Sequence, residues 1–273
     1  MTTVDSSVQT YSGIDDLSVD LVDGVLSLTM NRPASLNSLT KPMLATIADT
    51  LQRAAGDARV RVVRLGGAGR GFSSGAGISE SDHANPDATG TPADVLDAAN
   101  SAVRSIVSLP QPVVAVVQGP AAGVGVSLAL ACDVVLASEK AFFMLAFTKI
   151  GLMPDGGASA LIAAAVGRIR AMRMALLAER IPASEAYEFG LVTAVHPVEE
   201  FDAEVDKVIA MLAGGPRVAL RLTKDAINSA TLPELEAALE REKVGQLSLL
   251  DSGDFREGTK AFQQRRQANF TDS

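Results

Sequence analysis

Tryptophan is absent from the 273 residues, and the chain has only two tyrosines, two histidines and one cysteine. The single cysteine, Cys132, excludes an internal disulfide framework and is typical of a reducing compartment. The two histidines, His83 and His196, are far apart and form no metal-binding motif, so we expect no metal. With few aromatic residues, the core must be built from the aliphatic side chains that dominate the 47% hydrophobic fraction.

Basic residues are outnumbered, with 24 Lys and Arg against 32 Asp and Glu and a net charge of −8. This balance argues against a nucleic-acid partner, because phosphate contacts need clustered Lys and Arg, although a local basic group could still bind an anionic ligand. The polar, acidic start MTTVDSSVQTYSGIDD does not have the pattern of a signal peptide, so we expect a cytoplasmic protein. The uncharged segment 114–132 is broken by QGP at 118–120, which indicates a strand, a turn and a buried helix rather than a membrane span.

Strand and helix signals alternate over the first two thirds of the chain, and helical signals dominate the last third. The alternating segment Leu17–Met30 contains Asp23-Gly24 and predicts a β-hairpin. Periodicity and turn residues predict helices at 41–55, 93–109, 122–132, from about 158 and at 184–190, and strands at 60–65, 113–117 and 133–138. We therefore expect an α/β fold with a flexible N-terminus over residues 1–15, a core over 16–200 and a helical region over 201–273.

Two glycine-rich turns, each placed directly after a predicted strand, are candidates for a ligand site. They are GFSSGAGI at 71–78 and QGPAAGVGVSL at 118–128. Glycine lets the backbone approach a ligand closely, and the second turn ends at a helix N-terminus, where free N–H groups favour an anion. The two turns could each direct one N–H at a single oxygen, which is an oxyanion hole. Glycine content alone leaves a purely structural turn as an equal alternative.

Five segments resemble the crotonase (enoyl-CoA hydratase/isomerase) superfamily in order and spacing, and the resemblance covers about residues 18–270. They are LTMNRPASLNSLT, GFSSGAGIS, VVQGPAAGVGVSLALACDVVLAS, IGLMPDGG and FREGTKAFQQRRQANF. The resemblance implies a crotonase-like spiral of ββα turns with a helical C-terminal trimerisation region. It also implies a homo-trimer or hexamer and a coenzyme A thioester as substrate, with no separate cofactor and no membrane partner.

The resemblance further implies roles for individual residues. The backbone amides of Ala76 and Val124 would bind the thioester oxygen. Phe262 and Arg265 match tail positions that reach the coenzyme A of a neighbouring subunit in relatives, and core packing or a solvated charge are the alternatives. The adenine-binding segment and the wall of the substrate site would comprise Ser35, Leu36, Asn37, Ser74, Gly75, Ile78, Gly123, Ser127 and Phe147.

The two glutamates that typical hydratases of this family use are missing, because Ser127 and Phe147 occupy their positions. One acid remains, Asp155 in the turn MPDGG. The resemblance is closest to the enoyl-CoA isomerase branch, in which the aspartate of the PD pair is the general base. One carboxylate can take a proton from one carbon and return it to another, so we expect conversion of 3-enoyl-CoA to 2-enoyl-CoA. The alternative for Asp155 is a helix N-cap.

Three other functions stay open at this point. The first is a hydratase with relocated acids, such as Asp155 with Glu80. The second is a non-catalytic acyl-CoA carrier that kept the pocket and lost the chemistry. The third uses Asp155 as a nucleophile on an aryl thioester, as in the family's dehalogenase branch, but few aromatic residues are expected around the site.

Overall fold

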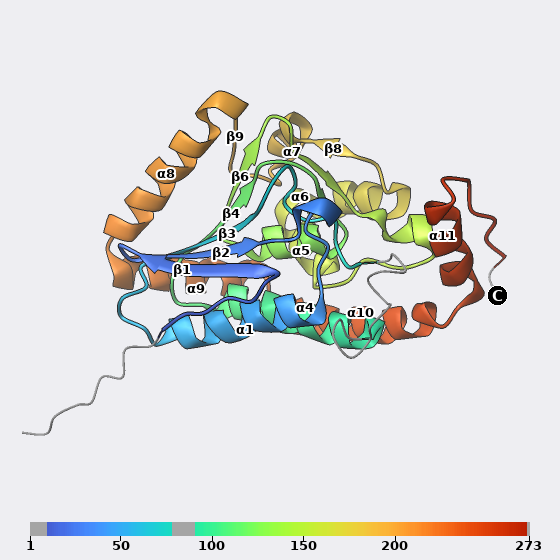
Figure 1. The fold of residues 1–273 in the computed structure, drawn as a ribbon, viewed down its shortest axis with the longest axis horizontal. Coiled ribbons are helices and arrows are strands. Elements are labelled where there is room, and N and C mark those ends of the chain that lie inside the picture. The colour runs from blue at the N-terminus through green and yellow to red at the C-terminus, as the bar shows by residue number, and fades with distance from the viewer. Residues whose placement is uncertain (1–9, 78–90, 272–273) are drawn as a thin grey trace, which may run out of the picture.

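The centre of the computed structural model is a six-stranded sheet in the order β1-β2-β3-β4-β6-β9 (Figure 1). The structure describes residues 10–77 and 91–271. A second, three-stranded sheet has the order β5-β7-β8. The strands are β1 (Leu17–Val22), β2 (Val25–Met30), β3 (Val62–Gly67), β4 (Val113–Val117), β5 (Ala121–Ala122), β6 (Val134–Ser138), β7 (Phe142–Met144), β8 (Ile181–Pro182) and β9 (Ala194–His196).

The predicted hairpin is confirmed. Strands β1 and β2 pair antiparallel, with Val22 opposite Val25. Asp23 and Gly24 between them both have positive φ, of 48° and 85°, as a two-residue type I′ turn requires. The remaining neighbours in the six-stranded sheet pair in parallel, which agrees with the expected α/β class.

Helices cover both faces of this sheet. Alternate residues of a strand point to opposite faces, so Val114 and Val116 of β4 pack with Phe201 of α8 (Val198–Gly214) on one face. Ala115 and Val117 point the other way, into the larger core that α1 (Lys41–Ala55) and α4 (Pro92–Ser108) close. Figure 1 shows α8 on one side of the sheet and α1 with α4 on the other.

Several predicted boundaries are shifted by tertiary pairing. The helix expected at 122–132 is α5 (Val124–Ala131), because Ala121 and Ala122 form β5 and pair with β7. The strand expected at 60–65 runs over 62–67 instead, in register with both β2 and β4. The helices expected from about 158 and at 184–190 are α6 (Ala158–Leu177) and α7 (Ala183–Phe189).

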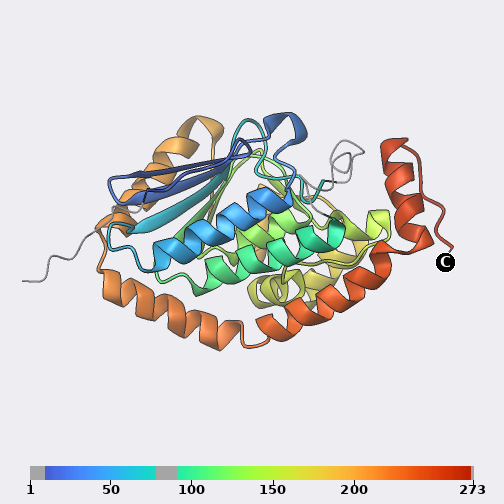
Figure 2. The same ribbon diagram turned by 60° about the horizontal axis from the view of Figure 1, so that its bottom comes forward.

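The last part of the chain is helical, as predicted, but its first helix begins at Val198 and packs on the sheet. Helices α9 (Arg217–Thr231) and α10 (Leu235–Leu250) follow one another beneath α1 and α4, and α11 (Gly253–Gln263) turns away from α10 (Figure 2). No residue of α9 is buried. Within the described ranges, no helix is both long and apolar enough to cross a membrane.

Candidate active site

A cavity of about 710 Å³ opens among both glycine-rich turns, α4, α10 and α11. It also borders η2 (Ala146–Ile150), a short 3-10 helix. Most of the site residues predicted from the sequence meet in its wall. These are Ser35, Leu36, Ser74, Gly75, Ala76, Gly123, Val124, Phe147, Asp155 and Phe262.

The two glycine-rich turns lie side by side in parallel. Ser73 pairs with Ala121, and the Ala122 N–H donates to the Ser73 carbonyl oxygen at 2.8 Å. Two residues further along each turn, Gly75 meets Gly123. A Cβ added to Gly75 would lie 3.3 Å from the Cα of Gly123, so the backbones approach as closely as glycine allows. The same register therefore aligns the next residues of the two turns.

Those next residues are Ala76 and Val124. Val124 is the first residue of α5, where an N–H group has no acceptor within the helix. Across the residues that the structure describes, the backbone hydrogen bonds use neither the Ala76 nor the Val124 amide. The structure thus brings together two unused N–H donors at the cavity wall, which is the arrangement expected of an oxyanion hole.

Asp155 lies in the turn before α6, and its side chain lines the same cavity while staying 9% exposed. Its Oδ2 accepts a hydrogen bond of 2.8 Å from Nε2 of Gln246. Its Oδ1 is buried and has no hydrogen-bond partner among the described residues. Burial raises the pKa of Asp155 to about 7; the Gln246 hydrogen bond opposes this rise and the charge of Glu242 adds to it.

The N-cap interpretation of Asp155 is wrong. The N-cap of α6 is Gly157, which offers no side chain. Glu242 of α10 replaces the cap, because its carboxylate accepts from the Gly157 N–H at 2.7 Å and from the Ser159 N–H at 2.8 Å. The carboxylate of Asp155 is therefore not engaged in holding the helix end.

Two predicted wall residues lie behind the cavity and support it. Ser127 is fully buried, and its hydroxyl donates to the backbone oxygen of Asp155 at 2.7 Å. Asn37 is also fully buried, and its Nδ2 donates to the Gly71 carbonyl oxygen at 2.8 Å. Sequence position alone could not show that these side chains bind the protein's own backbone. Neither residue lines the cavity, and both side chains support the turns around it, so their predicted contact with a ligand stays a prediction.

The C-terminal tail meets its own chain's cavity. Phe262, near the end of α11, is 63% exposed and lines the cavity of its own subunit, where the sequence had suggested a neighbour's coenzyme A. Arg265 follows α11 and is not part of the cavity wall. Two further predicted residues, Ile78 and Glu80, lie outside the described residues.

Sequence reasoning missed the charge pattern of the cavity. Arg70, Lys149 and Arg180 line it, and the Arg180 guanidinium lies 4.9 Å from the ring centre of Phe142. Within the described part of the chain, Asp155 is the one acidic residue in this wall. A protein of net charge −8 therefore carries three basic residues in one cavity wall, where they would attract an anionic ligand. The wall also holds more aromatic surface than expected, from Phe142, Phe147, Phe255 and Phe262.

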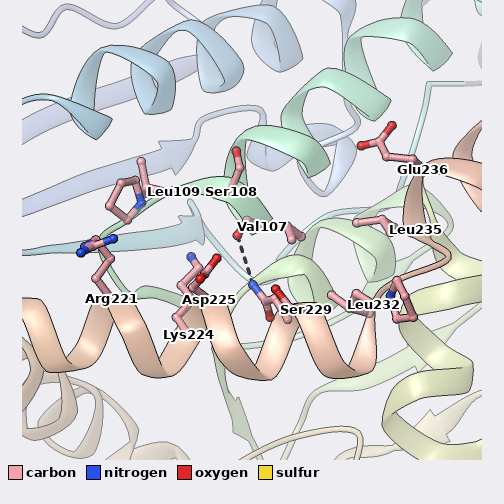
Figure 3. A pocket seen from close by; sticks show the side chains of 13 residues that line it. Val107, Ser108, Leu109, Arg221, Lys224, Asp225, Ser229, Leu232, Leu235 and Glu236 are labelled. Carbon is pink, nitrogen blue, oxygen red and sulfur yellow. Dashed lines mark hydrogen bonds between the residues drawn. The ribbon is translucent and has the colours of Figure 1, made fainter.

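A smaller cavity of about 390 Å³ lies between the end of α4 and α9 (Figure 3). Asn228 donates to the Val107 carbonyl oxygen there at 3.1 Å, and Lys224 is already paired with Asp133 at 2.9 Å. None of the predicted site residues lines this cavity, so the candidate active site is the larger one. Among the residues described, no cluster of His, Cys, Asp and Glu could hold a metal ion.

A largely parallel sheet with helices on both faces therefore carries a cavity whose wall holds two backbone amides unused by the described hydrogen bonds and one buried carboxylate. The family described as enoyl-CoA hydratase/isomerase matches residues 20–273, and the chain belongs to this family. It is 39% identical over 252 residues to the 1,2-epoxyphenylacetyl-CoA isomerase of Escherichia coli (strain K12), covering 91% of this chain and 95% of that protein. It is 32% identical to the 2,3-dehydroadipyl-CoA hydratase of the same strain, over 94% of this chain and 99% of that protein.

A solved structure gives the same assignment. The crystal structure of an enoyl-CoA hydratase from Mycobacterium avium subsp. paratuberculosis K-10 is 66% identical, with a TM-score of 0.88 over 95% of this chain and 100% of that one. The predicted crotonase-like α/β fold and superfamily are confirmed. The relatives include both isomerases and hydratases.

Proposed function

We propose that this enzyme moves the double bond of a 3-enoyl-CoA to the 2,3 position, with Asp155 as its single base. The observation that carries the proposal is one buried carboxylate in the same cavity wall as two backbone amides. Among the described residues, Oδ1 of this carboxylate and both amides have no hydrogen-bond partner. The isomerase relative from Escherichia coli supports it, since that protein too is named for isomerising a coenzyme A thioester.

The reaction needs one proton to move twice. Asp155 takes a proton from C2 of the 3-enoyl thioester, and the electron pair shifts onto the thioester oxygen as a dienolate. The amides of Ala76 and Val124 donate hydrogen bonds to that oxygen, an effect worth about 3–4 kcal/mol per donor in related sites. Asp155 then returns the proton to C4, the C2–C3 double bond forms, and the carboxylate is regenerated.

The environment of Asp155 suits this work. A base with a pKa of about 7 is partly ionised at neutral pH, yet holds a proton well enough to carry it between two carbons. Phe147 and Val124 present apolar side chains in the cavity wall that Asp155 also lines. With a substrate bound, apolar walls would keep water from the carboxylate and favour returning the proton over adding a hydroxyl. Arg70, Lys149 and Arg180 would bind the phosphates of coenzyme A.

Hydration is the second candidate, favoured by the names of the hydratase relatives. It requires a second acid-base group to activate water. Glu242 is a second buried carboxylate beside the Asp155 turn, but it already accepts hydrogen bonds from two backbone N–H groups at the N-terminus of α6. The hydratase proposal therefore depends on Glu80, outside the described residues.

A carrier or a nucleophilic role is less well supported. A pure carrier gains nothing from keeping a carboxylate buried with one oxygen unpaired, because burial without a partner costs stability. The four phenylalanines of the cavity are compatible with an aryl thioester, so an aryl-CoA substrate belongs in the same assay.

Assembly into a homo-trimer or hexamer stays a proposal. It is supported by α9, a helix without a buried residue that exposes Val218, Leu222 and Ile227. We expect light scattering at micromolar concentration to give three or six times the mass of one chain. A monomer would contradict this proposal without affecting the chemistry.

The test is incubation of the enzyme with 3-enoyl-CoA and, separately, with 2-enoyl-CoA, followed by product analysis. The proposal predicts interconversion of the two and little 3-hydroxyacyl-CoA. Faster hydration than isomerisation would overturn it in favour of the hydratase. Tight binding of acyl-CoA without turnover would favour the carrier.

A further inference from the structure

The inner face of α10 carries two polar residues where its pattern calls for apolar ones. The buried stripe of this helix runs through Leu235, Ala238, Leu239, Glu242 and Gln246, at the spacing of one helix face. Glu242 is 1% exposed and Gln246 is 2% exposed. Buried polar groups are tolerated when they are hydrogen-bonded, so the partners of these two side chains show what they do.

Gln246 connects two points of the turn that carries Asp155. Its Oε1 accepts from the Met153 N–H at 3.1 Å, and its Nε2 donates to Oδ2 of Asp155 at 2.8 Å. The orientation of the amide is fixed by chemistry, because a backbone N–H can only donate and must face the amide oxygen. The NH₂ group is thereby forced toward the carboxylate.

This contact leaves the two carboxylate oxygens of Asp155 unequal. Oδ2 is held by Gln246, whereas Oδ1 has no hydrogen-bond partner in the parts of the chain that the structure describes. We propose that Gln246 is the positioning residue of the catalytic base, holding Oδ2 of Asp155 so that the carboxylate keeps one orientation in the cavity wall. This inference rests on the proposed isomerase function and adds a specific residue to it.

The neighbours of Asp155 shift its pKa in known directions, so the proposal predicts whether this pKa rises or falls when Gln246 is changed. Glu242, on the same helix as Gln246, is the ionisable group whose charge acts on Asp155, and it raises the pKa of Asp155. Gln246 lowers the same pKa because its N–H stabilises the charged carboxylate. Arg70, Lys149 and Arg180 line the cavity, but none of them contributes to the shift.

Two variants of Gln246 test the contact. Gln246→Met keeps the length of the side chain and removes both hydrogen bonds. We expect kcat at pH 7 to fall about 10–100-fold and the acidic limb of the kcat profile to move up by about one pH unit, with KM changed less than about threefold. Gln246→Glu is isosteric and can still accept from Met153, but it places an acceptor opposite Oδ2. The limb should then move up further than in Gln246→Met.

The matched control is Gln111→Met. Gln111 is also buried, and its Nε2 donates one hydrogen bond of 2.8 Å, to the Ala54 carbonyl oxygen, away from the cavity wall. Loss of this buried amide should lower thermal stability and leave both kcat and the pH profile unchanged. A purely structural role of Gln246 predicts the same result for Gln246→Met.

A direct titration separates this inference from the proposed reaction. The ¹³C resonance of the Asp155 carboxyl, assigned by its loss in Asp155→Asn, should titrate at higher pH in Gln246→Met and Gln246→Glu than in the wild type. If the wild type fails to isomerise but the titration moves, the reaction is wrong and the positioning contact stands. If the wild type isomerises and neither the titration nor the pH profile moves in either variant, Gln246 does not position the base and the inference is overturned.

Discussion

The two halves of the candidate active site are built in different ways. The oxyanion half is made of backbone, from two glycine-rich turns whose residues pair in a fixed register between Ser73 and Ala121. The carboxylate half is made of side chains, and Asp155 depends on Gln246, 91 residues away in the sequence. The oxyanion half should tolerate a change of side chain, provided that the backbone conformation of the two turns is kept. The carboxylate half should respond to a single substitution, because one change of charge or of hydrogen bonding alters the pKa of Asp155.

The largest effect is expected at the carboxylate itself. Asp155→Asn keeps an amide oxygen that can accept from Gln246 and removes the base. Turnover of 3-enoyl-CoA should therefore fall about 10²–10⁴-fold while binding of acyl-CoA changes little. Steady-state kinetics and calorimetry with an unreactive acyl-CoA would check this. Undiminished isomerisation would exclude Asp155 as the base.

The same variant should also reveal the cost of burying Asp155. Because its folded-state pKa is raised from 3.8 to about 7, the residue's stabilising contribution is complete below about pH 3.8 and is lost as the pH rises through about 7. The melting temperature of the wild type should fall relative to that of Asp155→Asn between pH 5 and pH 8. The complete loss, over the interval from pH 3.8 to about 7, corresponds to roughly 4 kcal/mol, and most of it falls above pH 5. A constant difference across this range would contradict the raised pKa.

A change of shape in the backbone half should have the next largest effect. Gly75 has a φ of +86°, and a Cβ there would lie 2.8 Å from the Ala122 carbonyl oxygen. Gly75→Ala should push the two turns apart and lower kcat about 10–100-fold through poorer oxyanion binding. The acidic limb of the pH profile should stay in place. Gly56→Ala is the control, since a Cβ at Gly56 meets nothing within 4 Å.

Glu242 should affect the carboxylate half with the opposite sign to Gln246. In Glu242→Gln one amide oxygen cannot serve both the Gly157 and Ser159 N–H groups, so we expect a loss of about 1–3 kcal/mol in stability. Removing the negative charge should lower the pKa of Asp155 and move the acidic limb of kcat to lower pH. An upward movement would show that the charge of Glu242 does not act on the base.

The smallest effect is expected at Ser127. Ser127→Ala removes one hydrogen bond to the Asp155 backbone oxygen, which is worth about 1 kcal/mol of stability. Activity should fall less than about threefold, with the acidic limb unmoved, because the side chain carries no proton in the reaction. A large loss of kcat would instead assign Ser127 a direct part in the chemistry.

The contrast between the two halves also explains what the sequence could predict. The hairpin at Asp23-Gly24, the helix over 41–55 and both glycine-rich turns follow from local patterns, and the structure agrees with them. The contacts of Asp155 could not be predicted from local patterns, because they depend on how α10 packs against the turn before α6. Gln246 and Glu242 occupy the buried stripe of α10, and a polar pair on an apolar stripe was the available signal. Their partners in the Asp155 turn could not be deduced from spacing.

In the proposed reaction, one buried carboxylate carries the proton from C2 to C4. The most direct test uses a 3-enoyl-CoA with two deuterium atoms at C2, converted in ordinary water and analysed by mass spectrometry and NMR. We expect deuterium at C4 of the 2-enoyl-CoA product, because burial shields the proton on Asp155 from exchange with solvent. We also expect little product from Asp155→Asn. Product without deuterium at C4, formed at an undiminished rate by Asp155→Asn, would contradict the proposed reaction.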